Sequence, residues 1–261
     1  MDKILDYWEK MSDWVLPFLE GRKIAIEQMF GDFSMYHRHP TEDKEEWIYI
    51  KSRQEILDWA DKHAWSFHPH IQGDKNWWFV VDVDSRGKGF DLDLTKRVAV
   101  VLAEVFEELS FKYLVKYSGS RGFHFMWEWD MTGKKLKKDE QWDKAQEMIE
   151  NLRKILEGKL LIDKDLTEKL RKLAKKDCSL VVTNSQDKNC KHSILLDANI
   201  LHENANIRSP FSVHLGTGLV SVPLKGIDGL KKFKKLDAKR AEVMKQDWSW
   251  VELPKNKWRP I

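Results

Sequence analysis

The amino-acid sequence predicts a mixed α/β (α+β) fold, in which strands that end in polar residues are separated by amphipathic helices. Residues 77–83 form an apolar, β-favouring run with the length of one buried strand. Between about residues 94 and 109, apolar side chains recur with the spacing of one helix face. Two apolar segments, 113–117 and 123–129, flank a short glycine-rich loop and indicate two further strands. In a chain of 261 residues, these elements are enough to enclose a core.

The N-terminal part of the chain is expected to alternate helix and strand. Apolar residues within 4–15 follow one helix face, and a short strand is expected at 24–26 after a glycine turn. The segment Ser52–Glu55 has the form of a capping box. It predicts that a second helix occupies about 53–64.

The C-terminal half is expected to contain two helices, at about 142–156 and 166–173, and a strand at 193–197. No internal repeat or low-complexity linker separates these segments. The sequence therefore predicts a single domain over 1–261, with its core at about 1–230 and a basic, Trp-containing tail at 231–261.

Composition limits the classes of protein that fit this chain. There are 45 Lys and Arg against 42 Asp and Glu, so no overall charge indicates a nucleic-acid partner, and any basic surface must be local. Thirteen Trp offer flat faces for the core or for stacking on bases. With two Cys, no signal peptide and no long apolar run, we expect a soluble cytoplasmic protein without a membrane partner.

The strand at 77–83 ends in two carboxylates. Because strand side chains alternate between faces, Asp82 and Asp84 point to the same side. Two carboxylates on one face form half of a site for a hard divalent ion such as Mg²⁺ or Mn²⁺. The alternative is a strand that simply ends in a polar turn, since Ser85 and Gly87 follow.

Three pieces occur in a fixed order along the chain: the Asp82–Asp84 strand end, the loop 118–124 and the strand that ends at Asp197. Nucleotidyl transfer uses such a set, because carboxylates hold two divalent ions while hydroxyl, imidazole and guanidinium groups hold the phosphates. The glycines of the loop would let backbone N–H groups approach phosphate oxygens.

These motifs resemble those of the archaeo-eukaryotic primase superfamily, and most closely the polymerase domains of bacterial and archaeal non-homologous end-joining ligases. Residues 57–69, 116–124 and 197–224 carry the resemblance, which covers about 1–230. It implies a primase-polymerase catalytic core of two lobes, with a mixed or antiparallel sheet that forms the active-site cleft.

The resemblance also implies roles for individual residues. Asp82, Asp84 and Asp197 would be the catalytic metal ligands and would hold two Mn²⁺ or Mg²⁺ ions. The nucleotide would be bound by Ser118, Ser120, Arg121, His124, Arg208, Ser212 and His214. The chain departs from the end-joining domains at Arg121, where they usually have Lys. It also departs at His214, which is more similar to the Ser-x-His motif of replicative primase small subunits.

The resemblance suggests nucleic-acid contacts at three further residues, each with a structural alternative. His68 matches a histidine of the end-joining domains, and Arg22 and Lys23 match a basic turn near their 5′-phosphate site. For the basic turn, ordinary solvated side chains are the favoured alternative.

A zinc site is not expected in this chain. Replicative primase small subunits carry a zinc-binding element between the second and third motifs, where this chain has Cys178, Cys190 and His192. These residues are one ligand short of a closed site unless His202 or Asp187 joins them, and they lack a standard spacing, so the sequence favours buried free thiols.

The motifs predict a template-dependent nucleotidyltransferase, and the resemblance implies a repair polymerase that fills gaps or joins ends and prefers ribonucleotides. A replicative primase catalytic subunit, or a non-catalytic nucleic-acid-binding module on the same fold, are the alternatives. The expected partners are DNA primer–templates or DNA ends and ribo- and deoxyribonucleoside triphosphates. The sequence leaves open whether the chain acts alone, with a ligase and an end-binding protein, or with a large primase subunit.

Overall fold

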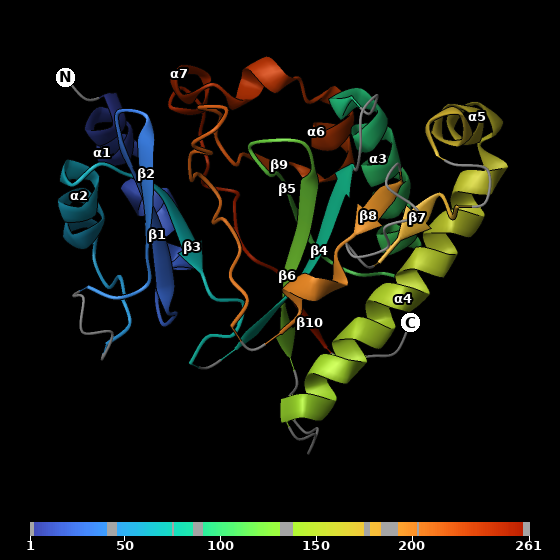
Figure 1. The fold of residues 1–261 in the computed structure, drawn as a ribbon, viewed down its shortest axis with the longest axis horizontal. Coiled ribbons are helices and arrows are strands. Elements are labelled where there is room, and N and C mark those ends of the chain that lie inside the picture. The colour runs from blue at the N-terminus through green and yellow to red at the C-terminus, as the bar shows by residue number, and fades with distance from the viewer. Residues whose placement is uncertain are drawn as a thin grey trace.

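The structure is a computed structural model. It describes residues 3–40, 46–74, 76–85, 91–130, 138–174, 178–183, 193–202 and 204–257. Two sheets organise these residues, one small and N-terminal and the other large and central (Figure 1).

The small sheet is antiparallel and has the strand order β2-β1-β3. Its strands are β1 (Ile24–Phe30), β2 (Phe33–His37) and β3 (Ala64–Pro69). The helices α1 (Lys3–Val15) and α2 (Arg53–Asp61) cover its outer side, and the short 3-10 helix η1 (Leu16–Phe18) follows α1 (Figure 1). Trp8 of α1 packs edge-on against Phe67 of β3, with ring centroids 5.0 Å apart. As predicted, Ser52 caps α2 by accepting a hydrogen bond from the Glu55 N–H.

The large sheet has the order β7-β8-β4-β6-β5-β9, with β10 added beside β6. Its strands are β4 (Trp77–Ser85), β5 (Leu114–Tyr117), β6 (Phe123–Asp130), β7 (Val181–Val182), β8 (Ile194–Leu196), β9 (Pro223–Leu224) and β10 (Lys255–Lys257). The β7–β8 and β10–β6 pairs are parallel and the others antiparallel, so the sheet is mixed as expected.

The remaining helices follow β4 along the chain. They are α3 (Leu92–Glu108), α4 (Lys138–Ile162), α5 (Lys164–Leu173), η2 (Ala198–Ile200), α6 (Gly226–Lys232), η3 (Lys235–Ala238) and α7 (Arg240–Val243). The helix predicted to begin at about 94 begins at 92, because the Asp91 side chain accepts a hydrogen bond from the Leu94 N–H and caps it. None of the helices among the described residues is long and apolar enough to cross a membrane.

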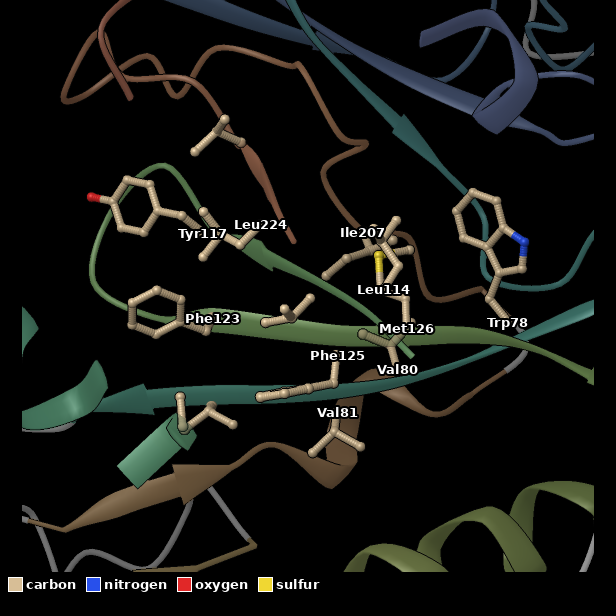
Figure 2. Close-up of a cluster of buried hydrophobic side chains, with 14 of the residues drawn as sticks. Trp78, Val80, Val81, Leu114, Tyr117, Phe123, Phe125, Met126, Ile207 and Leu224 are labelled. Carbon is tan, nitrogen blue, oxygen red and sulfur yellow. The ribbon is translucent and has the colours of Figure 1, made fainter. Parts of the chain in front are cut away.

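Packing of α3 decides which face of the large sheet is buried against helices. Phe106 of α3 contacts Phe125 and Trp127 of β6, with ring centroids 5.3 and 5.4 Å apart. Figure 2 shows the buried apolar side chains that β4, β5, β6 and β9 contribute around this sheet. The predicted alternation of β6 is therefore correct, because the aromatic side chains share the face toward α3 and His124 takes the other face.

The C-terminal segment continues the core instead of forming a separate tail. Phe233, Ala238, Val243 and Trp248 are buried, and the ring of Trp248 lies 5.2 Å from that of Phe211 between centroids. Apolar burial thus extends well past residue 230.

The prediction of free thiols is wrong for Cys178, which is disulfide-bonded and buried. A sulfur in a disulfide is not the thiolate that binds zinc. Cys190 and His192 lie outside the described residues.

Candidate active site

A row of three polar side chains crosses the middle of the large sheet. Antiparallel pairing places Asp82 of β4 opposite His124 of β6, and His124 opposite Lys116 of β5. Directly paired residues point to the same face of a sheet. The His124 Nε2 lies 3.4 Å from Asp82 Oδ1, and the Lys116 Nζ lies 2.6 Å from His124 Nδ1. This row lies on the face opposite the aromatic side chains that pack on α3.

Two further carboxylates lie beside this row. Asp84 points to the same face as Asp82, and its Oδ2 accepts a hydrogen bond of 2.9 Å from Arg121 Nη2. Asp197 follows β8, and its backbone N–H donates to the carbonyl oxygen of Asp82 at 3.0 Å. Its side chain caps η2 by accepting from the Asn199 N–H at 2.9 Å. The pairing of β4 with β8 thus brings the third aspartate to the strand that carries the first two.

The electrostatics of the three aspartates favour a cation. Burial, then the charges of Asp84 and Asp197, raise the pKa of Asp82 to about 7, while Lys116 and Arg121 oppose that rise. Carboxylate oxygens are the donors that Mg²⁺ and Mn²⁺ prefer. Among the described residues, no three His, Cys, Asp or Glu side chains converge closely enough to hold an ion as they stand. The carboxylate oxygens of the three aspartates fit divalent ions in chemical type and charge. In this structure Asp84 is hydrogen-bonded to Arg121, and Asp197 is hydrogen-bonded to Asn199.

The loop 118–122 presents a hydroxyl beside the row. Ser118 Oγ accepts hydrogen bonds from the N–H groups of Ser120 and Gly122, at 3.3 and 3.2 Å, and its own hydrogen has no acceptor among the described residues. A Cβ added at Gly122 would come within 2.3 Å of the Val83 carbonyl oxygen, so only glycine lets the loop approach β4 so closely. Gly119 has φ +89°, which disfavours other residues there.

Arg208 connects this loop to the small sheet. Its guanidinium donates to the Ser118 carbonyl through Nη1 and to the Ser66 Oγ through Nε, both at 3.2 Å. Its Nη2 lies 3.6 Å from Glu27 of β1. The segment that carries Arg208 runs between the two sheets (Figure 1, orange).

Two histidines flank Arg208. His68 Nε2 contacts Ser66 Oγ at 2.9 Å and Glu27 Oε2 at 3.3 Å, and burial lowers the pKa of His68 to about 4. His214 is half-buried, and burial followed by the charge of Arg208 lowers its pKa. Both rings are therefore neutral at physiological pH.

His124 and Lys116 are nearly or fully buried. Burial, then the charges of Lys116 and Arg208, lower the pKa of His124 well below its ordinary value, so that its ring is also neutral. Burial and the charge of Arg208 likewise lower the pKa of Lys116, and Asp82 opposes this. Positive and polar groups thus dominate this side of the site, which is an environment that would stabilise a bound anion.

The structure brings together most of the residues that the resemblance suggested: Asp82, Asp84, Asp197, Ser118, Ser120, Arg121, His124, Arg208 and His214. Ser212 is different, because its hydroxyl is engaged with the backbone of Phe67 and with Ser209 Oγ in the interior. It connects its loop to β3, and its geometry gives no support to a nucleotide contact.

The nucleic-acid contact suggested for Arg22 also finds no support. Arg22 is buried, donates to the carbonyl oxygens of His70 and Ile71, and stacks 3.8 Å above the ring of Trp78. Burial lowers its pKa to about 9. Lys23, in contrast, is partly exposed and lies over the ring of Trp47.

Sequence reasoning missed Lys116, Glu27 and Ser66 as members of this site. A lysine within the four-residue apolar strand β5 was a signal, since an unsolvated lysine in a strand core requires polar partners. Glu27 and Ser66 belong to strands whose pairing was not foreseen, and no local pattern distinguishes them.

This fold and site define a nucleotidyltransferase of the primase-polymerase class. The sequence matches the family model described as LigD, primase-polymerase domain, over residues 2–247, and the chain belongs to that family. The resemblance inferred from the sequence is thereby confirmed, as is a nucleotidyltransferase of the kind found in end-joining ligases.

Among solved structures, the polymerase domain from Mycobacterium tuberculosis Ligase D in complex with DNA is similar to this chain. The TM-score is 0.69 at 15% sequence identity, and the match covers 93% of this chain and 86% of that one. At this identity the comparison supports the fold alone, which agrees with the predicted primase-polymerase core. No curated protein matches the sequence.

Proposed function

We propose that this protein is a template-dependent polymerase that fills gaps or extends DNA ends during end joining, uses two Mn²⁺ or Mg²⁺ ions and prefers ribonucleotides. The observation that carries the proposal is the row Asp82–His124–Lys116 beside the Ser118 loop, in a chain of this family. In this row, carboxylate oxygens lie next to imidazole and ammonium groups of a type suited to holding phosphate.

Asp82, Asp84 and Asp197 would hold the ions. When bound, such ions supply an activated hydroxyl nucleophile and neutralise the charge that develops on the triphosphate. Binding the triphosphate is the task of the chain itself. In the part of the chain that the structure describes, the Ser118 hydroxyl hydrogen has no acceptor, and Arg208 is held by the Ser118 carbonyl on one side and Ser66 on the other.

The DNA strand would enter through a groove adjacent to this site. A cavity of about 710 Å³ is lined by Ser85, Ser120 and Arg121 next to the active-site aspartates. Lys96, Lys234 and Lys235 also line it, together with Asp91 and Asp93. Lys234 and Lys235 are exposed. Exposed cations beside the aspartates suit the phosphates of a primer strand, whose 3′-hydroxyl must reach the metal ligands.

His214 favours a second candidate, the catalytic subunit of a replicative primase, because a Ser-x-His sequence is more similar to those enzymes. The two candidates differ in substrate. The proposed repair polymerase extends a primer at a short gap or 3′ overhang, whereas a primase starts a strand on single-stranded template without a primer.

The deciding experiment compares nucleotide incorporation, with Mn²⁺, on gapped duplex, on 3′-overhang duplex and on primer-free single strands. We expect extension on the first two and none with Asp197→Ala. Synthesis only on the primer-free strand would favour the primase. A chain that binds DNA but incorporates nothing on any substrate would be the non-catalytic module.

A further inference from the structure

Lys116 is buried beside His124, and the proposed function assigns it no role of its own. Lys116 has no exposed surface, and within the described residues it forms no ion pair with a carboxylate. Its Nζ instead contacts two neutral groups, His124 Nδ1 at 2.6 Å and Ser221 Oγ at 2.9 Å. A buried lysine nitrogen needs partners for its hydrogens, and these contacts provide two of them.

A backbone carbonyl sets the direction of this hydrogen-bond chain. Ser221 Oγ donates its only hydrogen to the carbonyl oxygen of Tyr117 at 3.0 Å, and a carbonyl oxygen can only accept. Ser221 therefore accepts from Lys116. The order of donation along this part of the chain is Lys116 to Ser221 to Tyr117.

The hydrogens of Lys116 also decide whether His124 Nδ1 donates or accepts. An ammonium group has three hydrogens and no lone pair, so it donates to both neighbours. A neutral amine has two hydrogens, one for each of its two neighbours, and accepting from the ring would leave one buried hydrogen unpaired. In both protonation states, the arrangement that leaves the fewest hydrogens without a partner makes His124 Nδ1 an acceptor. A ring nitrogen that accepts a hydrogen bond carries no hydrogen, so the N–H of the His124 ring is then on Nε2.

The other end of the ring agrees with this assignment. Nε2 faces Asp82 Oδ1 at 3.4 Å, and an ionised carboxylate only accepts. Phosphate oxygens of a bound nucleotide would also accept.

We propose that Ser221 and Lys116 act as positioning residues that hold His124 in its Nε2–H tautomer and thereby aim a fixed N–H donor at the acidic and phosphate oxygens of the site. The role toward phosphate rests on the proposed function. The tautomer itself does not, since it follows from contacts among the protein's own side chains.

The test has a spectroscopic part that needs no substrate. Ring ¹⁵N–¹H correlation spectra of the full chain distinguish the two neutral tautomers, and His124→Gln assigns the signals. We expect Nε2–H in the wild type. We expect a mixture or the Nδ1–H form in Lys116→Met, which removes the donor, and a partial shift in Ser221→Ala. The matched control is Ser12→Ala, which changes another fully buried serine, one whose Oγ accepts a hydrogen bond from Arg53 Nε of α2.

The kinetic part measures kcat/KM for the nucleotide and Kd for DNA separately. Lys116→Met should lower nucleotide kcat/KM by roughly tenfold to a hundredfold, the size of one charge-assisted contact, and leave the DNA Kd within about twofold. An Nδ1–H ring in the wild type, or Ser221→Ala with an unchanged tautomer, would overturn the inference. This holds even if Lys116→Met fails to fold.

The inference and the proposed function can fail separately. If the wild type incorporates no nucleotide but its His124 tautomer responds to Lys116 and Ser221, the proposed function is wrong and the positioning role stands. If incorporation is normal in a folded Lys116→Met protein, the positioning role is wrong and the proposed function stands.

Discussion

Replacing Asp82 by Asn should stabilise the protein at alkaline pH while abolishing nucleotide incorporation. Asp82 has a side chain only 22% exposed and two carboxylate neighbours, and its pKa rises from 3.8 to about 7. Since one pKa unit corresponds to about 1.4 kcal/mol, ionising this group in the folded state costs about 4 kcal/mol. Asn is of similar size and carries no charge, so the variant avoids this cost.

The effect has a definite dependence on pH. A carboxyl whose pKa is raised by folding contributes stability that is complete below pH 3.8 and is lost as the pH rises to about 7. The advantage of Asp82→Asn in free energy of unfolding should therefore be near zero at pH 4 and reach about 4 kcal/mol at pH 8. In a chain of this length, that corresponds to a Tm higher by about 10 °C.

Urea unfolding at pH 4, 6 and 8 with a chelator present measures this difference. The control is Asp61→Asn, an exposed aspartate of α2. Adding Mn²⁺ at pH 8 should stabilise the wild type more than the variant, because a cation offsets the repulsion among the three carboxylates. A variant that is less stable than the wild type at pH 8, or a difference that does not change between pH 4 and 8, would refute the reasoning.

Three further predictions concern the surroundings of the site. Changing both Lys234 and Lys235 to Gln should weaken DNA binding and reduce the slope of log K against log salt by about 2, with an unchanged KM for nucleotide. The control is the same change at Lys169, a surface lysine that is paired with Asp165. An unaltered slope would show that DNA does not pass through this groove. Arg22→Met should lower the free energy of unfolding by roughly 3 kcal/mol in thermal or urea melts, because the buried carbonyls of His70 and Ile71 lose their donor. The control Lys23→Met should leave the free energy of unfolding unchanged. Weaker DNA binding of Arg22→Met with unchanged stability would contradict this prediction. Finally, kcat/KM for GTP opposite a templating cytosine should equal or exceed kcat/KM for dGTP, both with Mn²⁺ and with Mg²⁺. A strong preference for the deoxyribonucleotide with both metals would indicate a dedicated DNA polymerase.

Features that depend on neighbouring residues could be predicted from the sequence. Alternation along β4 placed Asp82 and Asp84 on one face, and alternation along β6 separated His124 from the aromatic residues. The capping box at Ser52 located the start of α2. The order of the three motifs indicated the family. Each of these follows from periodicity or capping chemistry that acts over a few residues.

Strands β2 and β3 could not be predicted in this way. Most side chains of β2 are exposed, so this short strand has no buried face that would mark it in the sequence, and both strands depend on pairing with β1. Glu27 and Ser66 became part of the site only through that pairing.

Tertiary structure alone decided how several polar side chains are used. Arg22 and Ser212 have the residue types of ligand contacts, yet the fold buries both and engages them with backbone groups. Lys116 has the residue type of a surface strand position, yet pairing with β6 and contact with Ser221 enclose it beside His124. Residue type sets which hydrogen bonds a side chain can form. Whether it forms them with the protein or with a ligand depends on segments distant in the chain, because burial and the partners within reach are properties of the folded state.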